Sequence, residues 1–123
     1  MKRLIAVALL LIVVIGVTTA CFIVTEHHYK KMTALITESA DLYKQGKSQA
    51  AAEKATAAKS HWERNEKLLT VFINRGVIDE IGEAVTRHDI LAKSGDTALF
   101  LAENAICLML IQHMHDVEQV MVY

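Results

Sequence analysis

The chain has 123 residues, with 13 basic and 14 acidic side chains and a formal net charge of −1. Lys2 and Arg3 are two of the basic residues, so residues 25–123 carry 11 basic against 14 acidic side chains, a balance of −3. This balance argues against a nucleic-acid partner, because nucleic-acid binding requires a basic surface. Two cysteines are too few for a disulfide framework. The absence of proline and the abundance of alanine, leucine, glutamate and lysine favour helices.

The amino-terminal stretch 4–24 has 21 consecutive residues without a charge and directly follows Lys2 and Arg3. As a helix it would be about 31 Å long, close to the hydrocarbon thickness of a bilayer. The run is longer than the apolar core of a typical cleaved signal peptide. We therefore expect residues 1–24 to form a signal anchor that crosses the membrane once, and residues 25–123 to form a separate helical domain.

Two other fates of this anchor are consistent with its sequence. Small residues at Thr18 and Ala20 would suit cleavage after Ala20, although the apolar run continues past that point. Thr19-Ala20-Cys21 loosely resembles a lipobox, in which Cys21 would carry the lipid of a lipoprotein.

The orientation of the anchor is inferred from the basic residues that flank it. Lys2 and Arg3 precede the span, whereas Lys30 and Lys31 follow it together with Glu26, so the positive-inside count is nearly balanced. A short basic start is typical of exported chains. We expect a single-pass protein of the cell membrane whose residues 25–123 lie outside the cytoplasm.

Residues 25–45 contain no glycine or proline and are predicted to be helical, either as a stalk continuous with the membrane helix or as a separate helix after it. Apolar positions alternate at spacings of three and four along this segment and form one stripe: Met32, Leu35, Ile36, Ser39, Leu42 and Tyr43. His27 and His28 precede the stripe and would lie at the level of the lipid headgroups. Their position indicates an interfacial belt, or a pH- or metal-responsive collar.

A second helix is predicted from Ser48, its N-cap, to about Arg75, after a turn at Gly46. Small and apolar residues recur along it with heptad spacing: Ala51, Ala55, Ala58, Trp62, Asn65, Leu69 and Phe72. The alanines would let a neighbouring helix approach closely, and Trp62 is expected to fill the core.

Gly76 marks the next turn, and a third helix is predicted from Val77 or Asp79 to Ser94. Gly82 weakens this helix by about 1 kcal/mol relative to alanine. The apolar face of the third helix is formed by Ile78, Ile81, Val85, His88 and Leu91 or Ala92.

The fourth helix is predicted to begin at Asp96, its cap, after Gly95, and to end near Val122. Its main buried stripe is expected to be Leu99, Ala102, Ile106, Leu110, His113, Val117 and Val120. Further apolar residues widen this stripe, which predicts a central helix buried nearly all round. A second membrane span is the alternative, but Glu103 and Asn104 interrupt it.

Lys44-Gln45-Gly46 recurs as Lys93-Ser94-Gly95, and each copy lies between two predicted helices. The predicted fold is therefore all-α: an N-terminal transmembrane helix followed by a small bundle of two αα-hairpins, either tetratricopeptide-like or up-and-down. Six residues are predicted for its structural core: Trp62, Leu69, Phe72, Ile81, Ile106 and Leu110.

The sequence contains few residues arranged for metal binding or catalysis. His113 and His115 are two residues apart and would point in different directions on a helix, and no His-x₃-His pair occurs. The carboxylates of Asp79, Glu80 and Glu83 suit the first turn of a helix, where they complement its dipole. No nucleophile motif or phosphate-binding loop accompanies them. We expect no enzymatic activity, no metal site and no cofactor.

The chain resembles a family of uncharacterised small bacterial membrane proteins, found mostly in Gram-positive bacteria and described only as a domain of unknown function. The resemblance rests on these stretches: Lys2-Arg3-Leu4-Ile5, Trp62-Glu63-x-Asn65, Leu69, Phe72-Ile73, Ile78-Asp79-Glu80-Ile81, Ile111-x-His113-Met114 and Glu118. It departs from the family in its less charged last helix and at Arg75-Gly76. The resemblance implies one N-terminal membrane helix and a helical tail, and no activity.

These observations predict a membrane-anchored, non-enzymatic helical protein that acts as an interaction or scaffold module. Apolar residues off the main stripe of the last helix would need cover from a protein partner or from a second copy: Leu101, Leu108, Met109, Met114 and Met121. The alternative is an extracytoplasmic domain that senses a ligand or metal through His27, His28, His88 or His113.

Overall fold

Four α-helices form the chain in a computed structural model, which describes the backbone of residues 1–71 and 73–122 and, up to residue 116, their side chains. They are α1 (Lys2–Lys44), α2 (Ser48–Leu69), α3 (Arg75–Ala92) and α4 (Thr97–Val122). No strand occurs among the residues described. The all-α fold predicted from the sequence is therefore confirmed.

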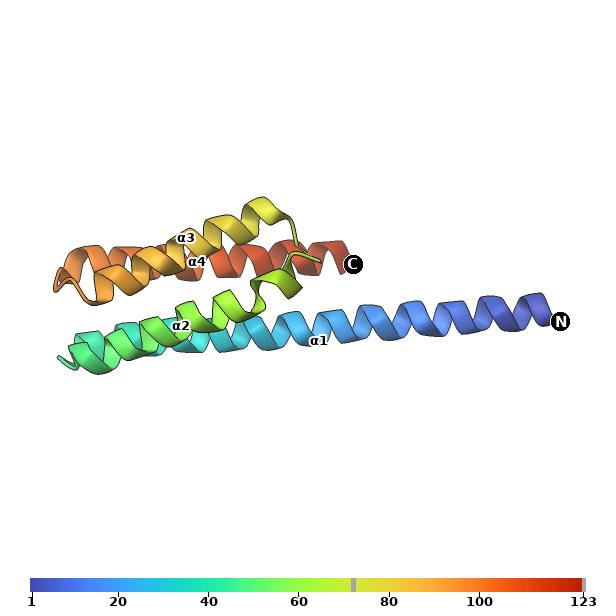
Figure 1. Ribbon diagram of the computed structural model, residues 1–123, viewed down its shortest axis with the longest axis horizontal. Helices are drawn as coiled ribbons and strands as arrows, with labels where there is room; N and C mark the ends of the chain where they lie inside the picture. Colours follow the sequence, from blue (N-terminus) through green and yellow to red (C-terminus); the bar gives the residue numbers. More distant parts are fainter. Residues whose placement is uncertain (72, 123) are drawn as a thin grey trace.

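The first helix, α1, runs without interruption for 43 residues, so the predicted stalk is continuous with the amino-terminal apolar segment (Figure 1). Every side chain of residues 1–20 is exposed, and the first buried residue of α1 is Thr25. By length and composition α1 is long and apolar enough to cross a membrane, and none of its apolar stretch is buried. The stretch Thr97–Asp116 of α4 passes the same test, with 33% of it buried.

The second half of α1 packs with the other three helices into a closed ring, in which α1 contacts α2, α2 contacts α3, α3 contacts α4 and α4 contacts α1. Short turns connect successive helices, which run antiparallel (Figure 1). The two hairpins thus form an up-and-down four-helix bundle rather than a tetratricopeptide-like array. No helix is central, so the prediction of a fourth helix buried all round was wrong.

The two ends of the bundle differ in what they contain. The proximal end is the one from which the exposed half of α1 extends, and it holds the α2–α3 turn and the carboxyl-terminal end of α4 (Figure 1). The distal end holds the turns at 45–47 and 93–96. Both distal turns contain a glycine with φ of +82°, at Gly46 and Gly95, a conformation that side chains with a Cβ rarely adopt. The repeated sequences Lys44-Gln45-Gly46 and Lys93-Ser94-Gly95 therefore form equivalent turns, and each ends a helix as predicted.

The proximal turn differs from its prediction. α2 ends at Leu69 rather than near Arg75, and Gly76 lies inside α3 instead of stopping a helix. The Asn74 side chain accepts a hydrogen bond of 2.7 Å from the backbone N–H of Gly76, so Asn74 caps α3. Asp79 consequently lies in the second turn of α3, not in the first. Ser48 is the first residue of α2 and makes no side-chain cap there.

The main core fills the ring from its middle to its proximal end. It contains Met32, Leu35, Ile36, Ala58, Trp62, Leu69, Ile78, Ile81, Ala84, Val85, Cys107, Ile111 and Met114. A smaller cluster at the distal end consists of Ala55, Ala92 and Phe100. The stripes predicted for the first three helices face these clusters, because small and apolar residues recur there at helical spacing.

The six predicted core residues divide into three groups. Trp62, Leu69 and Ile81 are buried, and Leu110 is partly buried and packs against the main core. Phe72 lies outside the residues described. Ile106 is 39% exposed, so its assignment to the core was wrong.

Trp62 lies between α2 and α3 with only 2% of its surface exposed. It faces Gly82 of α3, where an added Cβ would lie 3.2 Å from the indole Nε1. Gly82 weakens α3 locally, and the structure gives the reason for its presence: it leaves the room that the indole occupies.

Candidate interaction surface

The inner face of α4 carries polar side chains that are satisfied within the bundle. The Asn104 side-chain amide donates to the Ile36 carbonyl at 2.9 Å and lies 2.8 Å from His88 Nε2. Because the amide is a donor, Nε2 acts as the acceptor and the neutral His88 ring carries its proton on Nδ1. The buried carboxylate of Glu103 accepts a hydrogen bond of 3.0 Å from the Arg87 guanidinium. These contacts fix which side of α4 faces inward.

With these groups inside, apolar side chains of α4 face outward. They form a stripe with spacings of three and four residues, which we call the α4 ridge: Leu99, Ala102, Ile106, Met109 and His113. All five are exposed, Met109 with 62% of its surface. No charged residue belongs to the ridge. Four of its members had been predicted to belong to the buried stripe. The true inner face of α4 is therefore rotated about the helix axis relative to the predicted one.

The predicted partner contacts are distributed over both faces of α4. Met109 lies on the α4 ridge, as an interaction residue would. Leu101 and Leu108 are partly buried and pack against the distal cluster and the main core, respectively. Met114 is buried in the main core, so its assignment to a partner surface was wrong. Met121 lies among the side chains that the structure does not describe.

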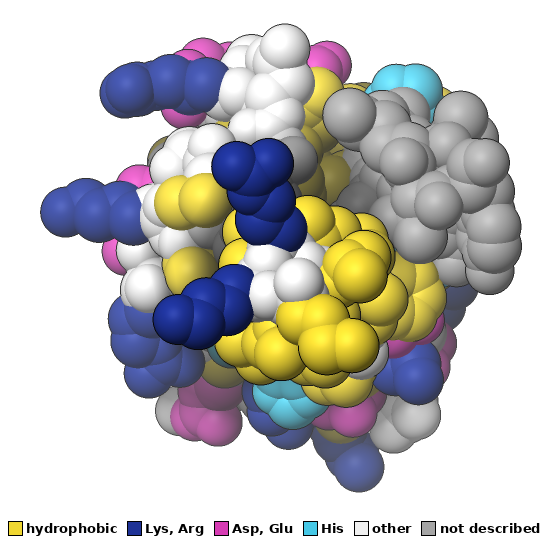
Figure 2. Space-filling model, turned by 90° about the vertical axis from the view of Figure 1, so that its right-hand side faces the viewer, with side chains coloured by type: hydrophobic (Ala, Val, Ile, Leu, Met, Phe, Trp, Pro, Cys, Tyr) yellow, Lys and Arg dark blue, Asp and Glu magenta, His cyan; other side chains and the backbone are white. Residues whose placement is uncertain are grey.

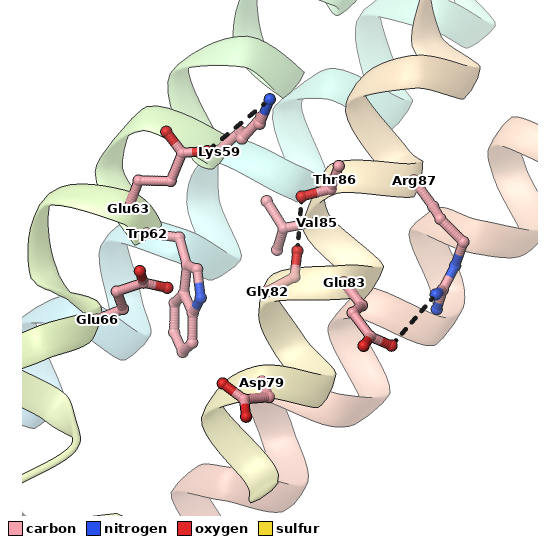
Figure 3. A pocket seen from close by; sticks show the side chains of 10 residues that line it. All are labelled: Lys59, Trp62, Glu63, Glu66, Asp79, Gly82, Glu83, Val85, Thr86 and Arg87. Atoms are coloured by element: carbon pink, nitrogen blue, oxygen red, sulfur yellow. Dashed lines mark hydrogen bonds and ion pairs between the residues drawn. The ribbon is translucent and has the colours of Figure 1, made fainter. Parts of the chain in front are cut away.

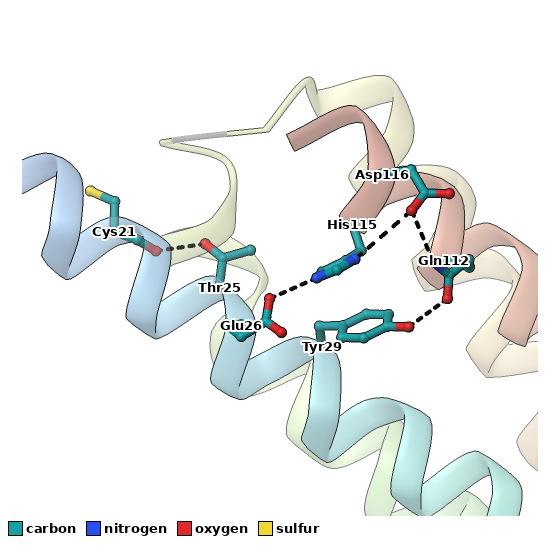
Figure 4. Close-up of polar contacts among 7 residues, drawn as sticks. All are labelled: Cys21, Thr25, Glu26, Tyr29, Gln112, His115 and Asp116. Atoms are coloured by element: carbon teal, nitrogen blue, oxygen red, sulfur yellow. Dashed lines mark hydrogen bonds and ion pairs between the residues drawn. The ribbon is translucent and has the colours of Figure 1, made fainter. Parts of the chain in front are cut away.

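A polar network joins α1 to α4 at the proximal end (Figure 4). His115 Nε2 lies 2.6 Å from a Glu26 carboxylate oxygen, and the His115 ring stacks on Tyr29 with centroids 3.9 Å apart. The Tyr29 hydroxyl donates to Gln112, whose amide donates in turn to Asp116 at 2.9 Å. The network holds α4 against α1 directly beside the point where α1 leaves the bundle.

The predicted histidine collar is divided by the fold. His27 is exposed, but His28 is buried and its Nδ1 lies 3.1 Å from Nε2 of His61 on α2. His28 therefore packs within the bundle instead of belonging to an interfacial belt, and that prediction was wrong. Burial lowers the pKa of both rings, and each is lowered further by a neighbouring histidine. Both are neutral at pH 7.

The other two histidines predicted to sense a ligand or metal lie in different environments. His113 is exposed on α4, whereas His88 is buried between α3 and α4. Cys107 is a buried thiol whose pKa is raised by burial to about 12, so it is not a reactive thiolate. Across the residues described, no group of three or more histidine, cysteine, aspartate or glutamate side chains could hold a metal ion.

An open groove of about 560 Å³ separates α2 from α3 on the outside of the bundle (Figure 3). It is lined by Trp62, Gly82, Val85 and Thr86, the carboxylates Glu63, Glu66, Asp79 and Glu83, and the cations Lys59 and Arg87. Both cations pair with carboxylates, Lys59 with Glu63 at 3.8 Å and Arg87 with Glu83 at 4.0 Å. These pairs are exposed, as expected of a solvated surface.

The fold and its exposed surface define a class of protein, an up-and-down four-helix bundle whose first helix extends as an exposed apolar segment. A model of the family DUF4363, a domain of unknown function, matches residues 22–122. The match covers most of the chain, which therefore belongs to this family. The resemblance to a domain of unknown function that was seen in the sequence is thus confirmed. No curated protein and no solved structure matches the chain.

Proposed function

We propose that this protein is a membrane-anchored, non-enzymatic interaction module whose bundle binds a second copy of the chain through the α4 ridge. The observation that carries the proposal is the exposed apolar face of α4. Its carboxylate and amide at Glu103 and Asn104 are buried, while Ile106 and Met109 face outward. An apolar stripe left uncovered on the surface of a folded bundle is typical of a protein-binding face.

Anchoring is supported by the amino-terminal half of α1. Its uncharged run spans residues 4–24, and every side chain from residue 4 to residue 20 is exposed. Such a surface would be costly in water but is matched by lipid. Lys2 and Arg3 favour the bundle on the outer side of the membrane. Protease added to intact protoplasts checks this orientation: removal of the bundle supports it, and digestion only after lysis reverses it.

The chemistry of the ridge favours a second copy as the partner. Its spacing suits packing against another helix, and without charged members it requires no complementary charge. Two copies anchored in one bilayer have the same orientation, so their α4 helices would meet side by side and parallel. Confinement to the membrane also raises the effective concentration of one ridge for the other.

The test compares two matched substitutions on exposed apolar residues. Met109→Asp places a charge on the ridge, and Ile90→Asp places one on α3, where Ile90 is 61% exposed. We expect the full-length protein in detergent micelles to be a dimer, Met109→Asp to be a monomer and Ile90→Asp to stay dimeric, as measured by light scattering. Trp62 fluorescence verifies that each variant is folded. A monomeric parent, or a dimeric Met109→Asp, would contradict the proposal.

A further inference from the structure

The α2–α3 turn, of which the structure describes residues 70, 71, 73 and 74, and the end of α2 before it expose apolar side chains at the proximal end of the bundle. Val71 has 73% of its surface exposed, and Leu68 is also exposed. Figure 1 shows this turn at the level where α1 leaves the bundle. Lys67 and Arg75, both exposed, flank the turn on either side. Apolar side chains between long basic ones are the arrangement found where a protein meets the lipid headgroups.

The length of the apolar run determines how deep this end must lie if α1 spans a bilayer. Residues 4–24 match the hydrocarbon thickness only if nearly all of them are immersed, since they extend for about 31 Å. The bundle already covers part of that run, because Cys21, Phe22 and Val24 are partly buried. These last positions correspond to about 6 Å of helix. The proximal end of the bundle is thereby drawn into the membrane interface.

The backbone of the turn suits that environment. The N–H of Thr70 bonds to Glu66 at 3.0 Å, that of Val71 to Leu68 at 3.2 Å, and that of Ile73 to Leu69 at 2.9 Å. Unpaired N–H groups are costly where lipid displaces water, and these three donors are paired within the chain. Viewed from this side, the molecule shows the hydrophobic surface of α1 at its centre, with Lys and Arg side chains projecting around it (Figure 2).

We infer that the α2–α3 turn is a second membrane contact, which inserts Leu68 and Val71 into the headgroup region of the same bilayer that α1 crosses. This inference rests on the proposed anchoring. Two points of contact would fix the tilt of the bundle relative to the membrane. The α4 ridge would then be held in an orientation that lets it meet a second copy in the same bilayer. The occupant of this apolar turn is therefore lipid, not protein.

The test uses an environment-sensitive fluorophore attached to Val71→Cys, with Ile90→Cys, near the distal end of α3 and outside the α4 ridge, as the control on another exposed apolar residue. Both are made in the full chain with Cys21→Ser, while Cys107 is buried and stays unlabelled. The proteins are placed in phosphatidylcholine vesicles that contain lipid with a quenching group near the headgroup. We expect strong lipid quenching and several-fold weaker iodide quenching at position 71, and the reverse at position 90.

The outcomes separate this inference from the anchoring on which it rests. Protein that floats with the vesicles but is quenched by iodide equally at positions 71 and 90 overturns the inference and leaves the anchor intact. Protein that does not float with the vesicles overturns both. Trp62 fluorescence before labelling verifies that each cysteine variant retains the parent fold.

Discussion

Replacing Trp62 with alanine is expected to lower the free energy of unfolding by about 3–5 kcal/mol, the usual cost of removing a buried tryptophan. Trp62 is almost wholly buried in the main core, between the alanine-lined half of α2 and the face of α3. Removing the indole would leave a large cavity, which α2 and α3 could close only by shifting towards each other. Urea unfolding of the full chain in micelles, followed by far-ultraviolet circular dichroism, measures the loss.

A second substitution tests the same packing from the opposite helix. Gly82→Leu introduces a good helix former where the indole lies, so its cost reports packing rather than helix propensity. The matched control is Glu80→Leu, at an exposed position of α3. We expect Gly82→Leu to destabilise the bundle and to shift Trp62 emission to longer wavelength, with neither change in the control. Equal unfolding midpoints for Trp62→Ala and the parent would contradict the burial of Trp62.

Acid is expected to destabilise the bundle through His88 by about 3 kcal/mol, calculated from its pKa shift. Burial lowers the pKa of His88 from 6.5 to about 4, and neighbouring Asp89 only partly opposes this effect. Between these two pH values the unfolded chain binds a proton that the folded chain does not. Stability is therefore highest above pH 6.5, falls as the pH drops towards 4, and changes no further through this group below pH 4.

The control for this prediction removes the titrating group while retaining a hydrogen-bond acceptor for Asn104. His88→Gln is expected to flatten most of the loss between pH 6.5 and 4, and His113→Gln, on the exposed ridge, is expected to leave it unchanged. Burial also lowers the pKa values of His28 and His61, so a smaller loss with the same sign should persist in His88→Gln. Urea unfolding midpoints over this pH range provide the measurement. A profile equally steep in His88→Gln would contradict this role of His88.

Sequence spacing predicted the faces of the first three helices because each has one stripe of small and apolar residues and a polar remainder. The seam from Ala51 to Leu69 and the face from Ile78 to Ala92 are examples. Gly46 and Gly95 were recognisable as helix ends because only a residue without a Cβ adopts their positive φ easily. At Gly76 the same rule failed, since its φ is ordinary and Asn74 provides the cap.

The rotation of α4 could not be derived from hydrophobicity, because this helix is apolar on both sides. Its inner face is set by four polar contacts with residues distant in the sequence: Asn104 with Ile36 and with His88, Glu103 with Arg87, and His115 with Glu26. One signal was present in the sequence. A histidine on the apolar face of α3, His88, requires a buried polar partner, and Asn104 on the adjacent helix was the available one.

Photo-crosslinking in native membranes directly tests the claim that the anchored bundle pairs with a second copy through the α4 ridge. A photoreactive amino acid is placed at Met109, with the same group at Ile90 as the control for an equally exposed apolar position on α3. We predict a single ultraviolet-dependent product of twice the chain mass from position 109 and none from position 90. A product of position 109 with a different protein would assign the ridge to another partner. No product at 109, or the same product from both positions, would contradict the claim.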